Sequence, residues 1–189
     1  MPDRIEQIFK ESIAVKQKTL EKNREAIRLA VAAIVKSFKA GNKVILFGNG
    51  GSAADSQHVA AEFVGRFQKE RRALPAVALT TDTSCLTALS NDYSFDIVFS
   101  RQIEALGQAG DTAIAISTSG NSRNVMEGVT TARKLGLRTI ALTGGDGGAL
   151  ASMAEVALIV PSEVTARVQE AHSVILHCLC ELVEQECLS

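Results

Sequence analysis

Five short runs of apolar and β-branched residues recur along the chain, and a helical or polar stretch separates each run from the next. They cover residues 43–47, 76–80, 112–117, 138–142 and 156–160. Strands that are continuously apolar and alternate with helices are typical of a parallel sheet with both faces covered. The pattern therefore predicts an α/β fold.

Helical periodicity flanks this region at both ends. Apolar residues recur at helical spacing over residues 5–39, with a break at Asn23, which predicts two helices. Residues 165–187 are apolar nearly all round, so we expect a buried helix there, packed in the domain or at a subunit interface. A chain of 189 residues suits one domain. We predict a single domain over residues 1–189, in which residues 1–40 form an N-terminal helical extension.

Composition excludes several classes of function. The 20 basic and 21 acidic residues give a net charge of −1. The protein therefore lacks the positive electrostatic field of a nucleic-acid binder, and we expect no nucleic-acid partner. No apolar stretch reaches the ~20 residues of a membrane helix, and the start lacks a signal-peptide core. We therefore expect a cytoplasmic protein with no membrane partner. The four cysteines form no CxxC pair, which favours free thiols over disulfides or a cysteine zinc site.

The first candidate site is the turn GNGGSA at residues 48–53, between the first strand and a helix over residues 54–67. Glycines let the backbone turn sharply and approach an anion, and Ser52 is placed to cap the helix at its positive end. The turn also imitates a dinucleotide fingerprint, although Asp82 lies 34 positions beyond Gly48 instead of about 20 past the fingerprint. A tight turn chosen only for packing remains the alternative.

The second candidate site is STSGNS at residues 117–122, again between a strand and a helix. Four hydroxyl groups and the N–H groups of a helix N-terminus form a cage for one phosphate, with no lysine or metal required. This favours a phosphomonoester over a dinucleotide. The alternative is a plain helix cap by Ser119 or Asn121, which would use only one of these side chains.

Two further polar groups lie on helices. His58, Glu62 and Arg66 are spaced to share one helix face, either as a site with a proton-abstracting carboxylate or as a solvated face. Gln169 and His177, with other polar residues, interrupt the apolar C-terminal helix, where each needs a partner or water because an unpaired group costs about 1–3 kcal/mol. A buried histidine bonded to the backbone is the alternative there.

Together, five segments resemble the phosphoheptose isomerases of the sugar isomerase (SIS) domain family. The segments are FGNGGSAADSQHVAAEFVGRF (47–67), TTDTSCLTALSNDYSFDIVFSRQIEALG (80–107), ISTSGNSRNV (116–125), ALTGGDGG (141–148) and ARVQEAHSVILH (166–177). The resemblance spans nearly the whole chain. It implies a five-stranded parallel sheet in flavodoxin-like order, assembled as a homotetramer whose active sites use neighbouring subunits. It also implies that sedoheptulose 7-phosphate is converted to D-glycero-D-manno-heptose 7-phosphate without a nucleotide cofactor.

The resemblance assigns roles by position. Glu62 matches the catalytic base of the family and His177 its catalytic acid. Substrate-binding positions of the family fall on Asn49, Gly50, Gly51, Ser52, Arg66, Asn91, Asp92, Ser117, Thr118, Ser119, Ser122 and Gln169. Some relatives bind zinc at the positions of His58, Glu62, Gln169 and His177.

Two points temper this assignment. Gln169 and His177 stand about 12 Å apart along a helix, so sharing one zinc ion needs extended side chains or different subunits. Ala166 replaces an acidic residue that some relatives carry, which leaves any role of that acid open.

A non-catalytic SIS-domain tetramer that binds the bacterial replication initiator is the alternative function. Such relatives lack ionisable residues at the base and acid positions, whereas this chain keeps Glu62 and His177.

Overall fold

The computed structural model describes residues 3–188, so residues 1, 2 and 189 of the predicted domain lie outside the described residues. Its five strands are β1 (Val44–Gly48), β2 (Ala76–Ala78), β3 (Thr112–Ser117), β4 (Arg138–Gly144) and β5 (Val156–Val160). All pair in parallel, in the order β2-β1-β3-β4-β5. The predicted five-stranded α/β sheet is confirmed.

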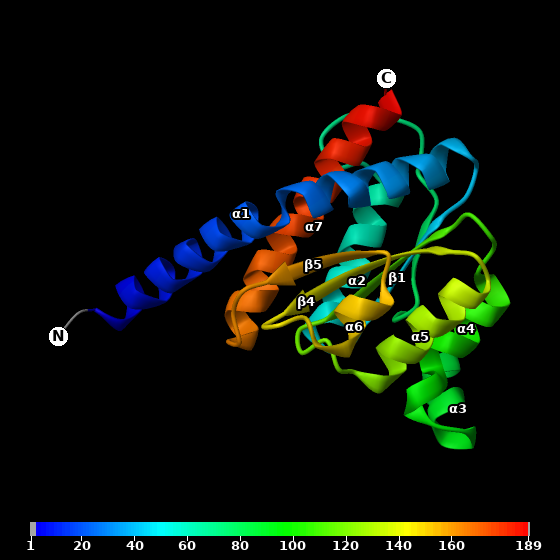
Figure 1. Cartoon of the computed structure of the whole chain (residues 1–189). Coiled ribbons are helices and arrows are strands. Elements are labelled where there is room, and N and C mark those ends of the chain that lie inside the picture. Colours follow the sequence, from blue (N-terminus) through cyan, green and yellow to red (C-terminus); the bar gives the residue numbers. More distant parts are fainter. Residues whose placement is uncertain (1–2, 189) are drawn as a thin grey trace.

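Helices cover both faces of this sheet (Figure 1). The helices α1 (Arg4–Lys39), α2 (Gly51–Val64) and α7 (Thr165–Leu188) pack on one face, over side chains such as Leu46 and Ile114. The other face carries α4 (Val98–Leu106), α5 (Arg123–Lys134) and α6 (Gly148–Met153), over Phe47 and Ala113. A short helix α3 (Thr83–Asp92) and the 3-10 turn η1 (Phe95–Ile97) extend this second layer. Adjacent strand residues face opposite layers because side chains alternate along a strand.

The predicted break at Asn23 is wrong, because α1 is one continuous helix of 36 residues. Asn23 is buried and points at the outer strand β5. Its Nδ2 donates to the carbonyl of Ile159 at 3.0 Å, and its Oδ1 accepts from the N–H of Ile159 at 2.8 Å. The asparagine thus pairs with the open edge of the sheet as another strand would. A tertiary contact, rather than a helix stop, accounts for a polar residue on this apolar face.

The C-terminal helix α7 is confirmed and crosses α1 on the same face of the sheet (Figure 1). Its buried face includes Val168, Leu176 and Leu179, whereas Val174 is 52% exposed. All four cysteines are free thiols. Among residues 3–188, no helix combines the length and apolar character needed to cross a membrane.

Candidate functional site

The glycine turn after β1 brings the start of α2 close to two other elements. Gly50 caps the helix with a φ of +56°, a conformation that favours glycine. A Cβ on Gly51 would overlap the side-chain amide of Gln169, so glycine there lets α7 approach the end of α2. The predicted cap by Ser52 is wrong. Ser52 lies inside the first turn, 3% exposed, and Gly50 takes the cap position without a side-chain hydrogen bond.

The glycine turn is joined to the second candidate loop by a pair of amides. Asn49 Nδ2 donates to Asn124 Oδ1 at 2.9 Å, and Asn124 Nδ2 donates to Asn49 Oδ1 at 3.0 Å. Asn124 is 3% exposed and lies in the first turn of α5. Since β1 and β3 are neighbouring strands, the turns that follow them meet at the same edge of the sheet.

The loop at residues 117–122 presents hydroxyl groups at the N-terminus of α5. Ser117 Oγ and Ser122 Oγ are 3.0 Å apart and share a hydrogen bond, and Ser119 Oγ accepts from the N–H of Asn121. Ser122 takes the cap position of α5 without a side-chain cap bond, so neither Ser119 nor Asn121 caps this helix. A hollow of about 270 Å³ beside the loop is lined in part by Thr118 and Ser119. Hydroxyl groups beside a helix N-terminus suit a single anion.

A second polar cluster lies where α2 packs on α7. His58 Nε2 is 2.8 Å from His177 Nε2, within hydrogen-bond distance, and 3.7 Å from Glu62 Oε1. The Glu62 side chain is 23% exposed and that of His58 is 51% exposed, so solvent and ligands can reach the cluster. The predicted shared face of His58 and Glu62 is therefore present, and His177 joins it from α7. A carboxylate beside two imidazoles can accept, hold and return protons.

Asp55 also belongs to this cluster, although the sequence analysis missed it. Burial raises the pKa of the Asp55 carboxyl, while nearby His58 and His177 and a hydrogen bond with Ser173 act to lower it. Asp55 precedes His58 by one helical turn, and an acidic residue at that spacing was the available signal.

Three predicted site residues lie apart from both clusters. Helix α2 ends at Val64, so Arg66 does not continue its face as predicted, and it pairs instead with Glu70 at 3.6 Å. Asn91 and Asp92 end α3, which packs with η1 and α4 in the layer opposite α2 and α7 (Figure 1). Within one chain these two side chains bond each other, from Asn91 Nδ2 to Asp92 Oδ1 at 2.9 Å.

The four predicted zinc ligands do not all converge in this arrangement, because Gln169 lies apart from the other three. Gln169 lies against Gly51, two turns of α2 before His58. The His58 and His177 nitrogens, 2.8 Å apart, are closer than the roughly 3.3 Å that separates two nitrogens on a tetrahedral zinc ion. Within residues 3–188, no three histidine, cysteine or acidic side chains are grouped to hold a metal ion. The four residues therefore do not fit a zinc site as they stand.

On α7, His172 is the buried, backbone-bonded histidine that the sequence analysis raised as an alternative to a functional one. It is fully buried, and its Nε2 lies 3.1 Å from the carbonyl of Thr143. Desolvation lowers the pKa of His172 to about 4, despite the opposing effect of the Thr143 hydrogen bond. The residue is a structural one that remains neutral at pH 7.

This burial predicts a pH-dependent stability. Below pH 6.5 the unfolded chain protonates His172 and the folded chain does not, so the free energy of unfolding falls as the pH drops toward 4. The total loss is about 3 kcal/mol at 1.36 kcal/mol per pH unit. We expect the free energy of unfolding of His172→Gln, measured with urea between pH 4.5 and 7, to depend less steeply on pH than that of the parent. Equal slopes in the variant and the parent would contradict the assignment.

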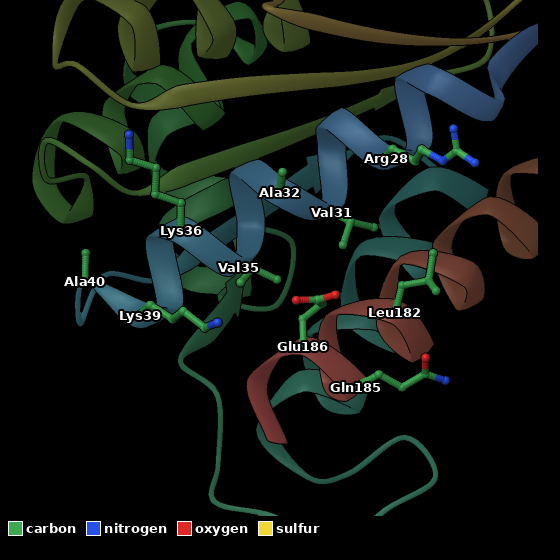
Figure 2. A pocket seen from close by; sticks show the side chains of 10 residues that line it. All are labelled: Arg28, Val31, Ala32, Val35, Lys36, Lys39, Ala40, Leu182, Gln185 and Glu186. Atoms are coloured by element: carbon green, nitrogen blue, oxygen red, sulfur yellow. The ribbon is translucent and has the colours of Figure 1, made fainter. Parts of the chain in front are cut away.

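A larger groove, of about 820 Å³, lies elsewhere on the protein. It runs between α1 and the end of α7, with apolar Val31, Val35 and Leu182 and the cationic Lys36 and Lys39 around it (Figure 2). No residue predicted for the site lines this groove. Size alone therefore does not make it the candidate active site.

Comparison with known proteins gives a consistent result. The SIS domain family model matches residues 7–144. A phosphoheptose isomerase of Aquifex aeolicus is 56% identical over 185 residues, covering 98% of this chain and 97% of the relative. A phosphoheptose isomerase of Citrifermentans bemidjiense is 60% identical over 161 residues, covering 85% and 84%. The solved phosphoheptose isomerase of Neisseria gonorrhoeae superposes with a TM-score of 0.92 at 46% identity, covering 96% of this chain and 97% of the other.

Proposed function

Since the chain belongs to the SIS domain family, and within it to the phosphoheptose isomerases, we propose that it interconverts sedoheptulose 7-phosphate and D-glycero-D-manno-heptose 7-phosphate. The chain is an isomerase that acts on a heptose phosphate. One observation supports the proposed mechanism most strongly. Glu62 and His177, the proposed base and acid, lie beside the same imidazole of His58 across the α2–α7 contact.

The distance between the two clusters suits a long linear substrate. Ser52 and Glu62 are ten residues apart on α2, which is about 15 Å along a helix. Helical side chains tilt toward the N-terminus, so the Glu62 carboxylate reaches back toward the hydroxyl loop. A phosphate bound by Ser117, Ser119 and Ser122 would leave the far end of an open-chain heptose near Glu62. Anchoring the phosphate in this way brings the reacting carbons toward Glu62.

The reaction then needs two pairs of proton transfers, one pair to form the enediol and one pair to form the aldose. Glu62 removes a proton from C1 of the ketose while His177 protonates the carbonyl oxygen at C2, which gives an enediol. Glu62 returns its proton to C2, and the hydroxyl at C1 gives its proton back to His177 to form the aldehyde. The His58–His177 hydrogen bond holds the acid in place. No proton, atom or electron pair is left over.

The activity is tested with sedoheptulose 7-phosphate and six-carbon phosphates in parallel, with NMR detection of the aldose. We expect the seven-carbon aldose to form and, in D₂O, deuterium to appear at C2. Turnover of the six-carbon substrates alone would contradict the proposed substrate.

Zinc enters this proposal only as the ion that the resemblance implies. Bound zinc would polarise a carbonyl or hydroxyl oxygen. Because Gln169 and the two histidines do not converge on one point, no step above is assigned to it.

We also propose a cytoplasmic homotetramer with shared active sites. The projecting half of α1 (Figure 1) exposes Ile5, Phe9 and Ile13 by 64–66%, which favours burial against a second copy. Asn91 and Asp92, in the layer opposite Glu62, would then serve a neighbouring subunit.

Mixed assemblies test this sharing. Asp92→Ala and Glu62→Gln are each expected to be poorly active alone. Subunits of the two variants mixed through mild dissociation should recover roughly a quarter of the wild-type activity, since half of the chains carry each intact group. No recovery in assemblies shown to be mixed would contradict a shared site. The alternative function, a non-catalytic scaffold for the replication initiator, receives no support from the comparisons.

A further inference from the structure

A buried ion pair joins the loop that follows α2 to the C-terminal part of α7, beyond the proposed catalytic residues. Arg71 Nε donates to Glu184 Oε1 at 3.1 Å, and the side chains are 3% and 2% exposed. Glu184 follows His177 by seven residues, or about two turns on the same helix face. A buried pair of this kind is weak evidence for stability by itself, because removing two charges from water is costly. Its contacts point to a second role.

The Arg71 guanidinium closes the end of α2. It donates to the carbonyls of Glu62 and Phe63 at 2.8 Å each, and to that of Gly65 at 3.2 Å. The last carbonyls of a helix lack partners within the helix, and here one guanidinium supplies them. One of them belongs to Glu62, so Arg71 directly holds the backbone of the proposed base.

The Glu184 carboxylate holds the loop that follows α2. Its oxygens accept the successive N–H groups of Phe67, Gln68 and Lys69 at 3.0, 2.9 and 2.8 Å. Burial alone would raise the pKa of Glu184, but these N–H groups and Arg71 lower it below its ordinary value. Glu184 therefore holds this loop as an ionised group.

The held loop reaches the proposed acid through Phe67. The Phe67 ring lies 5.5 Å from the His177 ring, between centroids, with planes tilted by 39°. The His177 ring also contacts the His58 ring, whose centroid is 5.1 Å away. The proposed acid is thus packed against both Phe67 and His58.

We propose that Phe67 and the Arg71–Glu184 pair are positioning residues for the isomerisation: they fix the His177 ring and its distance from Glu62. The proposal rests on the proposed function and adds residues that touch neither the reacting carbons nor the phosphate. A misplacement of about 1 Å can lower a rate by 10²-fold.

The test compares Phe67→Leu and Glu184→Gln with two controls. Phe67→Tyr keeps an aromatic ring, and Lys69→Ala keeps the N–H that Glu184 accepts while removing an exposed side chain. We expect Phe67→Leu and Glu184→Gln to lower kcat 10- to 100-fold with KM within twofold of the parent. Both controls should keep at least half of the parent kcat.

A spectroscopic measurement separates positioning from stability. With ¹³C-labelled imidazoles, the three histidines are assigned by single substitutions. We expect Glu184→Gln to shift the His177 resonance in the same direction as Phe67→Leu, well below the melting temperature. Wild-type kcat in folded Phe67→Leu, or a Glu184→Gln protein that only melts earlier, would overturn the proposal. If Glu184→Gln does not fold, Phe67→Leu and Phe67→Tyr decide it. Absence of heptose phosphate turnover in the parent would instead refute the proposed function.

Discussion

Glu62→Gln should lower kcat by 10²- to 10⁴-fold, because an amide of the same shape cannot accept the C1 proton. The Glu62 side chain is only 23% exposed, and its Oε1 lies 3.7 Å from His58 Nε2. Asp55, the other acidic member of this cluster, lies two turns earlier on α2. The rate is measured by the NMR assay with saturating sedoheptulose 7-phosphate.

A matched control exists in the loop after α2. Glu70→Gln makes the same chemical change on a side chain that is 90% exposed and lies 3.6 Å from Arg66 Nε. It should leave kcat within twofold of the parent. If Glu62→Gln folded, assembled and turned over as fast as Glu70→Gln, Glu62 would not be the base.

Ser119→Asp should lower kcat/KM by about 10²- to 10³-fold, since a carboxylate placed beside a phosphate dianion costs several kcal/mol. Ser119 is exposed in the hydroxyl loop, and its Oγ accepts the N–H of Asn121. Aspartate and asparagine make the same backbone bond, so the turn should persist in both. The measurement is a set of initial rates over a range of substrate concentrations.

Ser119→Asn separates charge from shape. Without the negative charge we expect a loss of about tenfold or less, from one hydrogen bond to a charged group. An equal loss in both variants would mean that no anion binds next to residue 119.

The strands were predictable because a buried strand is a short, continuous run of apolar residues in the sequence. The central strand β3, TAIAIS at residues 112–117, is buried along its whole length between two helical layers, so it shows no polar face of the kind that a surface strand has. Helix α1 was harder. Asn23 lies within the helix because its side chain bonds the backbone of Ile159, 136 residues away. No local sequence pattern predicts such a long-range hydrogen bond.

The site, too, was predictable only where local spacing determines which residues lie together. His58 and Glu62 share a helix face, which spacing alone foretells, and the hydroxyl loop follows a strand as expected. The end of α2 at Val64 depends on Gly65, Arg71 and Glu184 acting together, so the position of Arg66 could not be read from periodicity. His58 and His177 come together only because α2 packs on α7, a contact that the spacing of residues along the chain does not predict. The family resemblance did place both residues in one site.

A structure of the assembled protein with bound sedoheptulose 7-phosphate, solved for the slow Glu62→Gln variant, tests the account most directly. We predict the phosphate among the hydroxyls of residues 117–122, and C1 and C2 within hydrogen-bond reach of the residue 62 side chain. A phosphate bound elsewhere, or reacting carbons away from residue 62 of every subunit, would contradict it.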